Sequence, residues 1–130
     1  MFALKAGTQV FVRPGVTDLR LNFEGLRALV MQVMHGEPLS GHVFCFCNRA
    51  RNRVKCLIWD GSGFWVCAKR LERGSFDWPR DERAAITMNV AQLELLLTGF
   101  EIRSRRGWYR REEKMSHGRT RIELLAAQRL

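Results

Sequence analysis

The sequence predicts an α+β fold, in which an antiparallel β-sheet of about four to five strands is covered on one face by two amphipathic helices. Two observations lead to this prediction. Apolar residues recur with helical spacing in two separate segments, one before Gly36 and one after Asn89. Between them lies a block of short, β-rich runs joined by brief polar connections.

The first helical segment follows a short strand at Gln9–Arg13. We expect Thr17 or Asp18 to cap this helix and Gly36 to occupy its C′ position, with Pro38 preventing its continuation. Its apolar stripe consists of Phe23, Leu26, Leu29, Val30, Val33 and Met34.

The β-rich block contains three predicted strands, at His42–Cys47, Val54–Trp59 and Phe64–Lys69. Short connections, including a turn at Asp60–Gly63, make an antiparallel meander the simplest topology. A further short strand around Ser75–Trp78 and an extended Ile86–Met88 would add to the sheet.

The second helical segment begins with a capping-box pattern formed by Asn89 and Gln92, and Gly99 closes it. Its apolar side carries Val90, Leu93, Leu96 and Leu97. We therefore predict one α+β domain over residues 1–103, followed by a basic and flexible tail over residues 104–130.

The chain is strongly basic, with a formal net charge of +9, and more than half of this excess follows residue 103. Arginine supplies most of it, and its planar fork suits phosphate, so nucleic acid is the favoured partner. An inert basic surface is the alternative. Without a long apolar run or a secretory signal, we expect a cytoplasmic protein with no membrane partner.

Cys45, Cys47, Cys56 and Cys67 are expected to be free thiols in a reducing compartment. Three neighbouring strands could bring them together as metal ligands. However, structural zinc sites typically use paired cysteines on tight turns, whereas these lie in mid-strand. We expect buried thiols that pack like small apolar side chains, and no metal or cofactor.

Basic residues occupy every other position at Arg49, Arg51, Arg53 and Lys55. In an extended conformation these four cations would point to one side and could follow a phosphate backbone. Opposite strand ends add further cations at Lys69, Arg70 and Arg73. The alternative is a solvated hairpin loop that protects a sheet edge.

Aromatic residues lie among these cations, at Trp59, Phe64, Trp65, Phe76 and Trp78. Exposed rings could stack on bases, but aromatic residues of a sheet more often pack in the core. We predict core positions for these five.

A metal-dependent nuclease would need converging carboxylates. The candidates are Asp18, Glu24, Asp60, Glu72 and Asp77, and their spacing matches no known metal-binding motif. No nucleophile and base are suitably arranged either. We therefore predict no catalytic residues.

An ordered series of short motifs resembles a known family over about residues 4–103. The matching motifs are Gly15–Arg20, Phe23–Leu26, Gly41–Phe44 with Phe46, Asn48–Arg53 with Lys55, Trp59–Gly61 with Gly63 and Phe64, Lys69–Glu72, Gly74, Phe76, Trp78–Pro79, Gln92–Leu93, Leu96–Leu97 and Gly99. The chain is similar to the small TnpB-type accessory proteins encoded by the second reading frame of insertion sequences of the "sixty-six" family.

This resemblance implies a bacterial accessory protein in DNA transposition, acting beside a separate transposase of the same element. We expect it to bind DNA at the element ends, the transposase, or both. The alternatives are an interaction module that contacts only the transposase, or a metal-dependent nuclease. The candidate DNA contacts are Arg49, Arg51, Arg53, Lys55, Lys69, Arg70, Arg73, Arg105, Arg106, Arg110 and Arg111.

Overall fold

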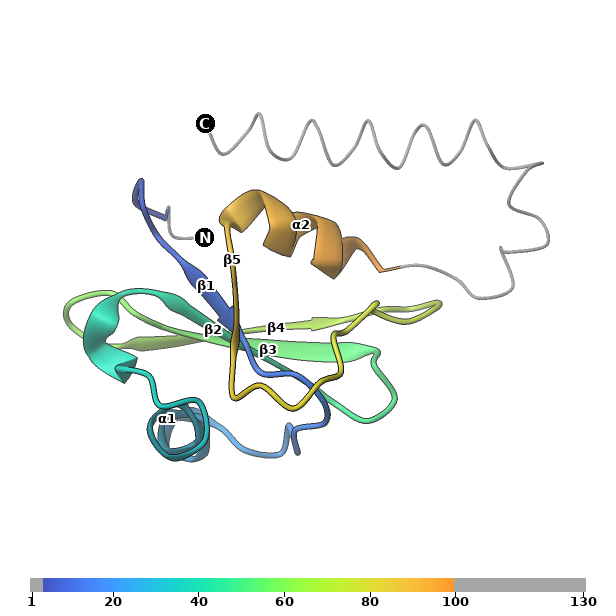
Figure 1. The fold of residues 1–130 in the computed structure, drawn as a ribbon, viewed down its shortest axis with the longest axis horizontal. Coiled ribbons are helices and arrows are strands. Elements are labelled where there is room, and N and C mark those ends of the chain that lie inside the picture. The colour runs from blue at the N-terminus through green and yellow to red at the C-terminus, as the bar shows by residue number, and fades with distance from the viewer. Residues whose placement is uncertain (1–3, 100–130) are drawn as a thin grey trace.

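A computed structural model describes residues 4–99, which form one sheet and two α-helices (Figure 1). The predicted tail, residues 104–130, lies outside the described residues. In chain order the elements are β1 (Val10–Val12), α1 (Phe23–Gln32), a short 3₁₀ turn (Pro38–Ser40), β2 (Val43–Cys47), β3 (Arg53–Trp59), β4 (Phe64–Arg70), β5 (Ile86–Met88) and α2 (Val90–Thr98).

The sheet has five strands in the order β4-β3-β2-β1-β5, which confirms the α+β class and the strand number. The meander β2-β3-β4 and the pair β1-β5 are antiparallel, but β1 and β2 are parallel. The sheet is therefore mixed rather than wholly antiparallel. The reason is the connection between β1 and β2, because α1 returns the chain to the end of the sheet where β1 began.

The two helices lie on opposite faces of the sheet, so the prediction that both cover one face is wrong (Figure 1). The physical reason is the central strand β2, in which all five residues of Val43–Cys47 are buried. Successive side chains of a strand point to opposite faces. Both faces of β2 are therefore apolar, and each needs a covering layer.

One core lies between the sheet and α1. Its buried residues are Leu26, Val30, Met34, Phe44, Phe46 and Leu57. The N-cap of α1 is Asn22 rather than Thr17 or Asp18. Thr17 is buried, and Asp18 accepts the main-chain N–H of Arg20. The left-handed residue beyond the helix is His35 rather than Gly36, which instead leaves room for the ring of Phe44.

The second core lies between the sheet and α2. Its buried members are Val10, Val12, Val43, Cys45, Cys47, Val54, Cys56, Ile58, Phe76, Trp78 and Leu93. The predicted capping box between Asn89 and Gln92 is confirmed. Ile86–Met88 forms the edge strand β5, whereas Ser75–Trp78 adds no strand to the sheet. Within the described residues, no helix is long and apolar enough to cross a membrane.

Candidate nucleic-acid interface

The topology brings three connecting segments to one end of the sheet. Because β1 and β2 are parallel, residues 13–17 and residues 48–53 both leave the sheet at this end. The segment of residues 71–80 also begins here, because β4 runs antiparallel to β3. We call the surface made by these three segments the arginine end.

Main-chain hydrogen bonds join the three segments to one another. The amide of Gly15 donates to the carbonyl oxygen of Pro79 at 3.0 Å. The amide of Phe76 donates to the carbonyl oxygen of Arg51 at 2.6 Å. The amide of Leu71 donates to the carbonyl oxygen of Asn52 at 2.8 Å. The arginine end is therefore a connected backbone structure, although its parts are far apart in sequence.

The loop between β2 and β3 is organised by Asn48. Its Oδ1 accepts the amides of Asn52 and Arg53 at 3.1 and 3.0 Å, and its Nδ2 donates to Asn52 Oδ1 at 2.8 Å. Within this loop Arg51 has a φ of 59°, in the left-handed region that arginine rarely occupies. The Arg51 side chain thus projects from a strained backbone that the hydrogen bonds of this loop maintain.

Residues 76–80 are anchored by two aromatic side chains. Phe76 and Trp78 are buried in the core on the α2 side, with ring centroids 6.5 Å apart. Trp78 Nε1 also donates to the carbonyl oxygen of Arg13 at 2.8 Å. These contacts fix the backbone that presents the exposed Arg80 at the surface.

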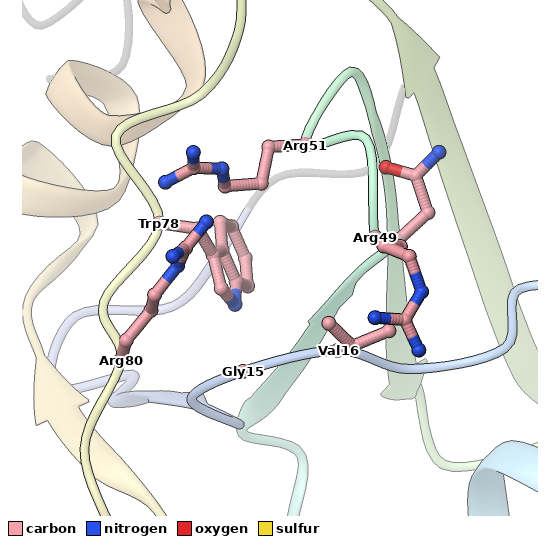
Figure 2. Close-up of a pocket in the computed structure, with 7 residues that line it drawn as sticks. Gly15, Val16, Arg49, Arg51, Trp78 and Arg80 are labelled. Atoms are coloured by element: carbon pink, nitrogen blue, oxygen red, sulfur yellow. The ribbon is translucent and has the colours of Figure 1, made fainter.

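A shallow hollow lies where the three segments meet. Its lining consists of Gly15, Val16, Asn48, Arg49, Arg51, Trp78 and Arg80, and we call it the arginine hollow. Arg51 and Arg80 extend from different segments toward Trp78, whereas Arg49 points toward Val16 (Figure 2). Among the described residues no carboxylate lines this hollow.

Ion pairing divides the basic residues into two groups. Arg70 pairs with Glu72 at 3.2 Å, and Arg83 pairs with Asp81 at 2.6 Å. Further from the hollow, Arg20 pairs with Asp18 and Arg27 with Glu24. Within residues 4–99, six arginines at the arginine end form no ion pair. Arg13 is half-buried and donates to Thr17 Oγ1, whereas the other five extend from the loops: Arg49, Arg51, Arg53, Arg73 and Arg80.

The predicted row of four cations is not a single row. Arg53 and Lys55 share one face of β3, but Arg49 and Arg51 lie in the loop before this strand. The left-handed backbone at Arg51 breaks the alternation on which the prediction depended. Arg49 and Arg51 therefore point in different directions (Figure 2).

The two lysines predicted to contact DNA form hydrogen bonds within the protein instead. Lys55 Nζ donates to the carbonyl oxygen of Leu21 at 3.0 Å, just before α1. Lys69 Nζ donates to the carbonyl oxygen of Leu97 at 2.8 Å, at the C-terminal end of α2, where a cation is favourable. Both lysines thus tie a helix end to the sheet.

Cross-strand pairing places Arg53 directly opposite Arg70 on β4. Like charges in such a pair repel each other, and Glu72 neutralises only Arg70. Arg73 follows in the next loop and is exposed. The remaining predicted contacts, Arg105, Arg106, Arg110 and Arg111, lie outside the described residues.

Sequence reasoning missed Arg80, which is not among the predicted DNA contacts. The available signal was its position two residues after Trp78, since a buried aromatic residue fixes the chain that follows it. The sequence alone could not show that residues 76–80 pack beside the β2–β3 loop.

The aromatic residues follow the core prediction only in part. Phe76 and Trp78 are buried, and Trp59 packs edge-on against Phe64 with ring centroids 5.0 Å apart. Trp65 is 47% exposed, and its Nε1 donates to Asp60 Oδ2 at 2.7 Å. None of these rings other than Trp78 lines the arginine hollow.

Three cysteines form a row across neighbouring strands, because Cys45 pairs with Cys56 and Cys56 pairs with Cys67. The Sγ atoms of Cys45 and Cys56 are 2.9 Å apart, and burial raises the pKa of the Cys45 thiol well above its ordinary value. Burial also raises the pKa of Cys47 to about 11. Within residues 4–99, no group of three or more histidine, cysteine or acidic residues is arranged to hold a metal ion.

Four of the five carboxylates considered for catalysis have local structural partners. Hydrogen bonds from Ser62, Trp65 and Gly63 lower the pKa of Asp60 to about 2. Hydrogen bonds from Arg20 lower that of Asp18 to about 2 as well. Glu24 and Glu72 are in the ion pairs described above, and Asp77 is exposed.

Comparison with known proteins identifies the family. The model of the family described as IS66 Orf2-like protein matches residues 8–107. An uncharacterised protein of Sinorhizobium fredii, y4hO, is 39% identical over 95 residues, which cover 73% of this chain and 83% of that protein. A second one from the same organism, y4jC, is 32% identical over 101 residues, which cover 78% and 86%. No solved structure matches the chain. The resemblance inferred from the sequence is thereby confirmed, and the chain belongs to the IS66 Orf2-like family of insertion-sequence accessory proteins.

Proposed function

We propose that this protein serves transposition as a DNA-binding accessory factor, and that its arginine end contacts the phosphate backbone. The observation that carries this proposal is the gathering of Arg49, Arg51, Arg53, Arg73 and Arg80 at one end of the sheet, with no ion pair within residues 4–99. Arginines without acidic partners remain available for phosphate, which their forked donors can bind through two hydrogen bonds.

Backbone contact is favoured over the reading of bases. Duplex DNA is read through its major groove by a helix or a β-ribbon that carries side chains to base edges. At the arginine end the cations instead lie on loops around a shallow hollow, and the buried Trp78 presents no free ring for stacking. Loop arginines of this kind position a protein on DNA without specifying sequence.

The test is fluorescence anisotropy with the terminal duplex of the element and a scrambled duplex of equal length, across a salt series. The variant Arg49→Ala/Arg51→Ala/Arg80→Ala should bind more weakly. The slope of log affinity against log salt should also flatten by roughly one unit per lost phosphate contact.

A matched control removes three charges elsewhere, in Lys5→Ala/Arg20→Ala/Arg27→Ala. This control should keep the wild-type slope if the arginine end makes the contacts. Equal flattening in both variants would mean that only the net charge matters. No DNA affinity in the wild type, together with co-purification with the transposase, would instead support a module that contacts only the transposase.

A further inference from the structure

We propose that the arginine hollow is a preformed seat for a single phosphate group, which in the protein's function is one phosphodiester of the DNA backbone. This inference rests on the proposed function for the identity of the ligand. It goes further by assigning one site, with Arg51 and Arg80 as the two arms of a clamp and Arg49 as a third cation at the rim (Figure 2).

The first argument is electrostatic. Three arginines line one small hollow, and no carboxylate among the described residues lines it with them. Each of the three lacks an ion pair within residues 4–99. Cations gathered in this way repel one another, and a bound anion removes this repulsion while gaining charge-assisted hydrogen bonds.

The second argument is preorganisation. Arg51 keeps its left-handed φ of 59° because its N–H donates to the carbonyl oxygen of Asn48 at 3.1 Å and its own carbonyl oxygen accepts from Phe76. A strained backbone that its surroundings maintain is typical of binding sites. Arg80 is placed by the buried Trp78 two residues earlier. The backbone that carries each arm of the clamp is therefore positioned before any ligand arrives.

The third argument concerns the size and chemistry of the ligand. The indole of Trp78 forms part of the wall, and its Nε1 is already bound to the carbonyl oxygen of Arg13. The hollow is too shallow to enclose a nucleobase, so it suits a compact tetrahedral oxyanion better. A phosphate with several acceptor oxygens can be shared by two arginines.

The probe for the test is inorganic phosphate, followed by ¹H–¹⁵N NMR, with sodium chloride at equal ionic strength as the reference. Saturable shifts should appear at the amides of Gly15, Asn48 and Arg51 and at the Trp78 indole. Arg51→Ala and Arg80→Ala should each weaken phosphate binding about tenfold, the effect of losing one charge-assisted hydrogen bond.

The matched control is Arg83→Ala, which removes an exposed arginine that pairs with Asp81 and does not line the hollow. It should change phosphate affinity by less than about twofold. Arg51→Gly removes the same side chain without requiring a left-handed non-glycine residue, so it replaces Arg51→Ala if that variant fails to fold. Unsaturable shifts, or equal losses in the Arg51 and Arg83 variants, would overturn the site.

DNA then separates the two proposals. Phosphate binding without DNA binding would leave the seat intact and refute the proposed function. DNA binding that is unaffected by Arg51→Ala and Arg80→Ala would refute the seat as a DNA contact and leave the proposed DNA-binding function standing. A duplex with 5′-phosphates should bind like one without them, and dependence on the terminal phosphate would overturn the backbone assignment. A poly-glutamate peptide that displaces phosphate where DNA does not would also overturn it.

Discussion

The main-chain carbonyl oxygen of Arg51 accepts a 2.6 Å hydrogen bond from the amide of Phe76, which joins the loop after β2 to the segment after β4. Phe76 is fully buried, so this bond connects the left-handed turn at Arg51 to the core on the α2 side. The position of the Arg51 side chain thus depends on a contact between segments that are remote in sequence.

Arg51→Gly should stabilise the protein while weakening its binding of phosphate and DNA. A non-glycine residue in the left-handed region costs about 1 kcal/mol, and glycine removes this cost. The greater freedom of glycine in the unfolded chain offsets part of the gain, so the expected net change is about 0.5 kcal/mol. A thermal melt should show a rise of about 2 to 4 °C. Arg73→Gly is the control, since Arg73 has no positive φ, and an equal rise there would contradict this explanation.

Lys55→Met should lower stability and leave the salt dependence of DNA binding unchanged. The Lys55 ammonium group donates to the carbonyl oxygen of Leu21, and its loss leaves this acceptor without that bond, at a cost of about 1 kcal/mol. Arg53→Met, on the same face of β3 but exposed, is the matched variant. It should change stability by less than about 0.5 kcal/mol and flatten the salt slope instead. Denaturant unfolding measures the change in stability, and anisotropy measures the salt slope. If Lys55→Met flattened the salt slope without lowering stability, Lys55 would be a DNA contact after all.

Local signals predicted much of the fold. The capping box of Asn89 and Gln92 and the meander of three strands are encoded within a few neighbouring residues. The apolar stripe of the first helix is confirmed for Leu26, Leu29, Val30 and Met34, whereas Phe23 is exposed. The placement of the helices was wrong, although Val43–Cys47 carried the signal that was needed. A continuous apolar run is typical of a strand that is buried on both faces.

The candidate site was less predictable because it depends on contacts between distant segments. The cations of the β2–β3 loop stand out in the sequence, but their directions depend on the left-handed turn at Arg51. Arg80 joins them only because Gly15 and Phe76 hydrogen-bond across the three segments. No periodicity or spacing rule encodes such main-chain contacts, so the hollow could be found only in the structure.

The cysteines should react slowly in the folded protein. Burial raises the pKa of Cys47 to about 11, and it raises the pKa of Cys45 and Cys67 as well. Alkylation requires the thiolate, which is scarce at pH 8 when the pKa is raised. Iodoacetamide labelling followed by peptide mapping should modify the partly exposed Cys67 first. The same reaction in denaturant is the control, and native Cys47 reacting as fast as denatured Cys47 would contradict the burial.

Asp60 should make the turn between β3 and β4 sensitive to acid. Its Oδ1 accepts the amides of Ser62 and Gly63 at 2.9 and 3.0 Å, and its Oδ2 accepts Trp65 Nε1 at 2.7 Å. These hydrogen bonds lower its pKa from 3.8 to about 2. Because the folded-state pKa lies below the unfolded value, the stabilisation is complete above pH 3.8 and is lost as the pH falls toward 2.

Asp60→Asn should therefore lower stability at neutral pH and reduce the slope of stability against pH in the acid range. The single oxygen of an asparagine can still accept the amides of Ser62 and Gly63, but its NH2 group cannot accept from Trp65 Nε1. The remaining hydrogen bonds involve no charge, so they are weaker and independent of pH. Denaturant unfolding between pH 2 and 7, followed by tryptophan fluorescence, measures both effects. Asp77→Asn is the control, since Asp77 is exposed and lies outside this turn. If both variants kept the wild-type acid slope, the turn would contribute nothing to it, and Asp18, whose pKa is also lowered to about 2, would be the next carboxylate to replace.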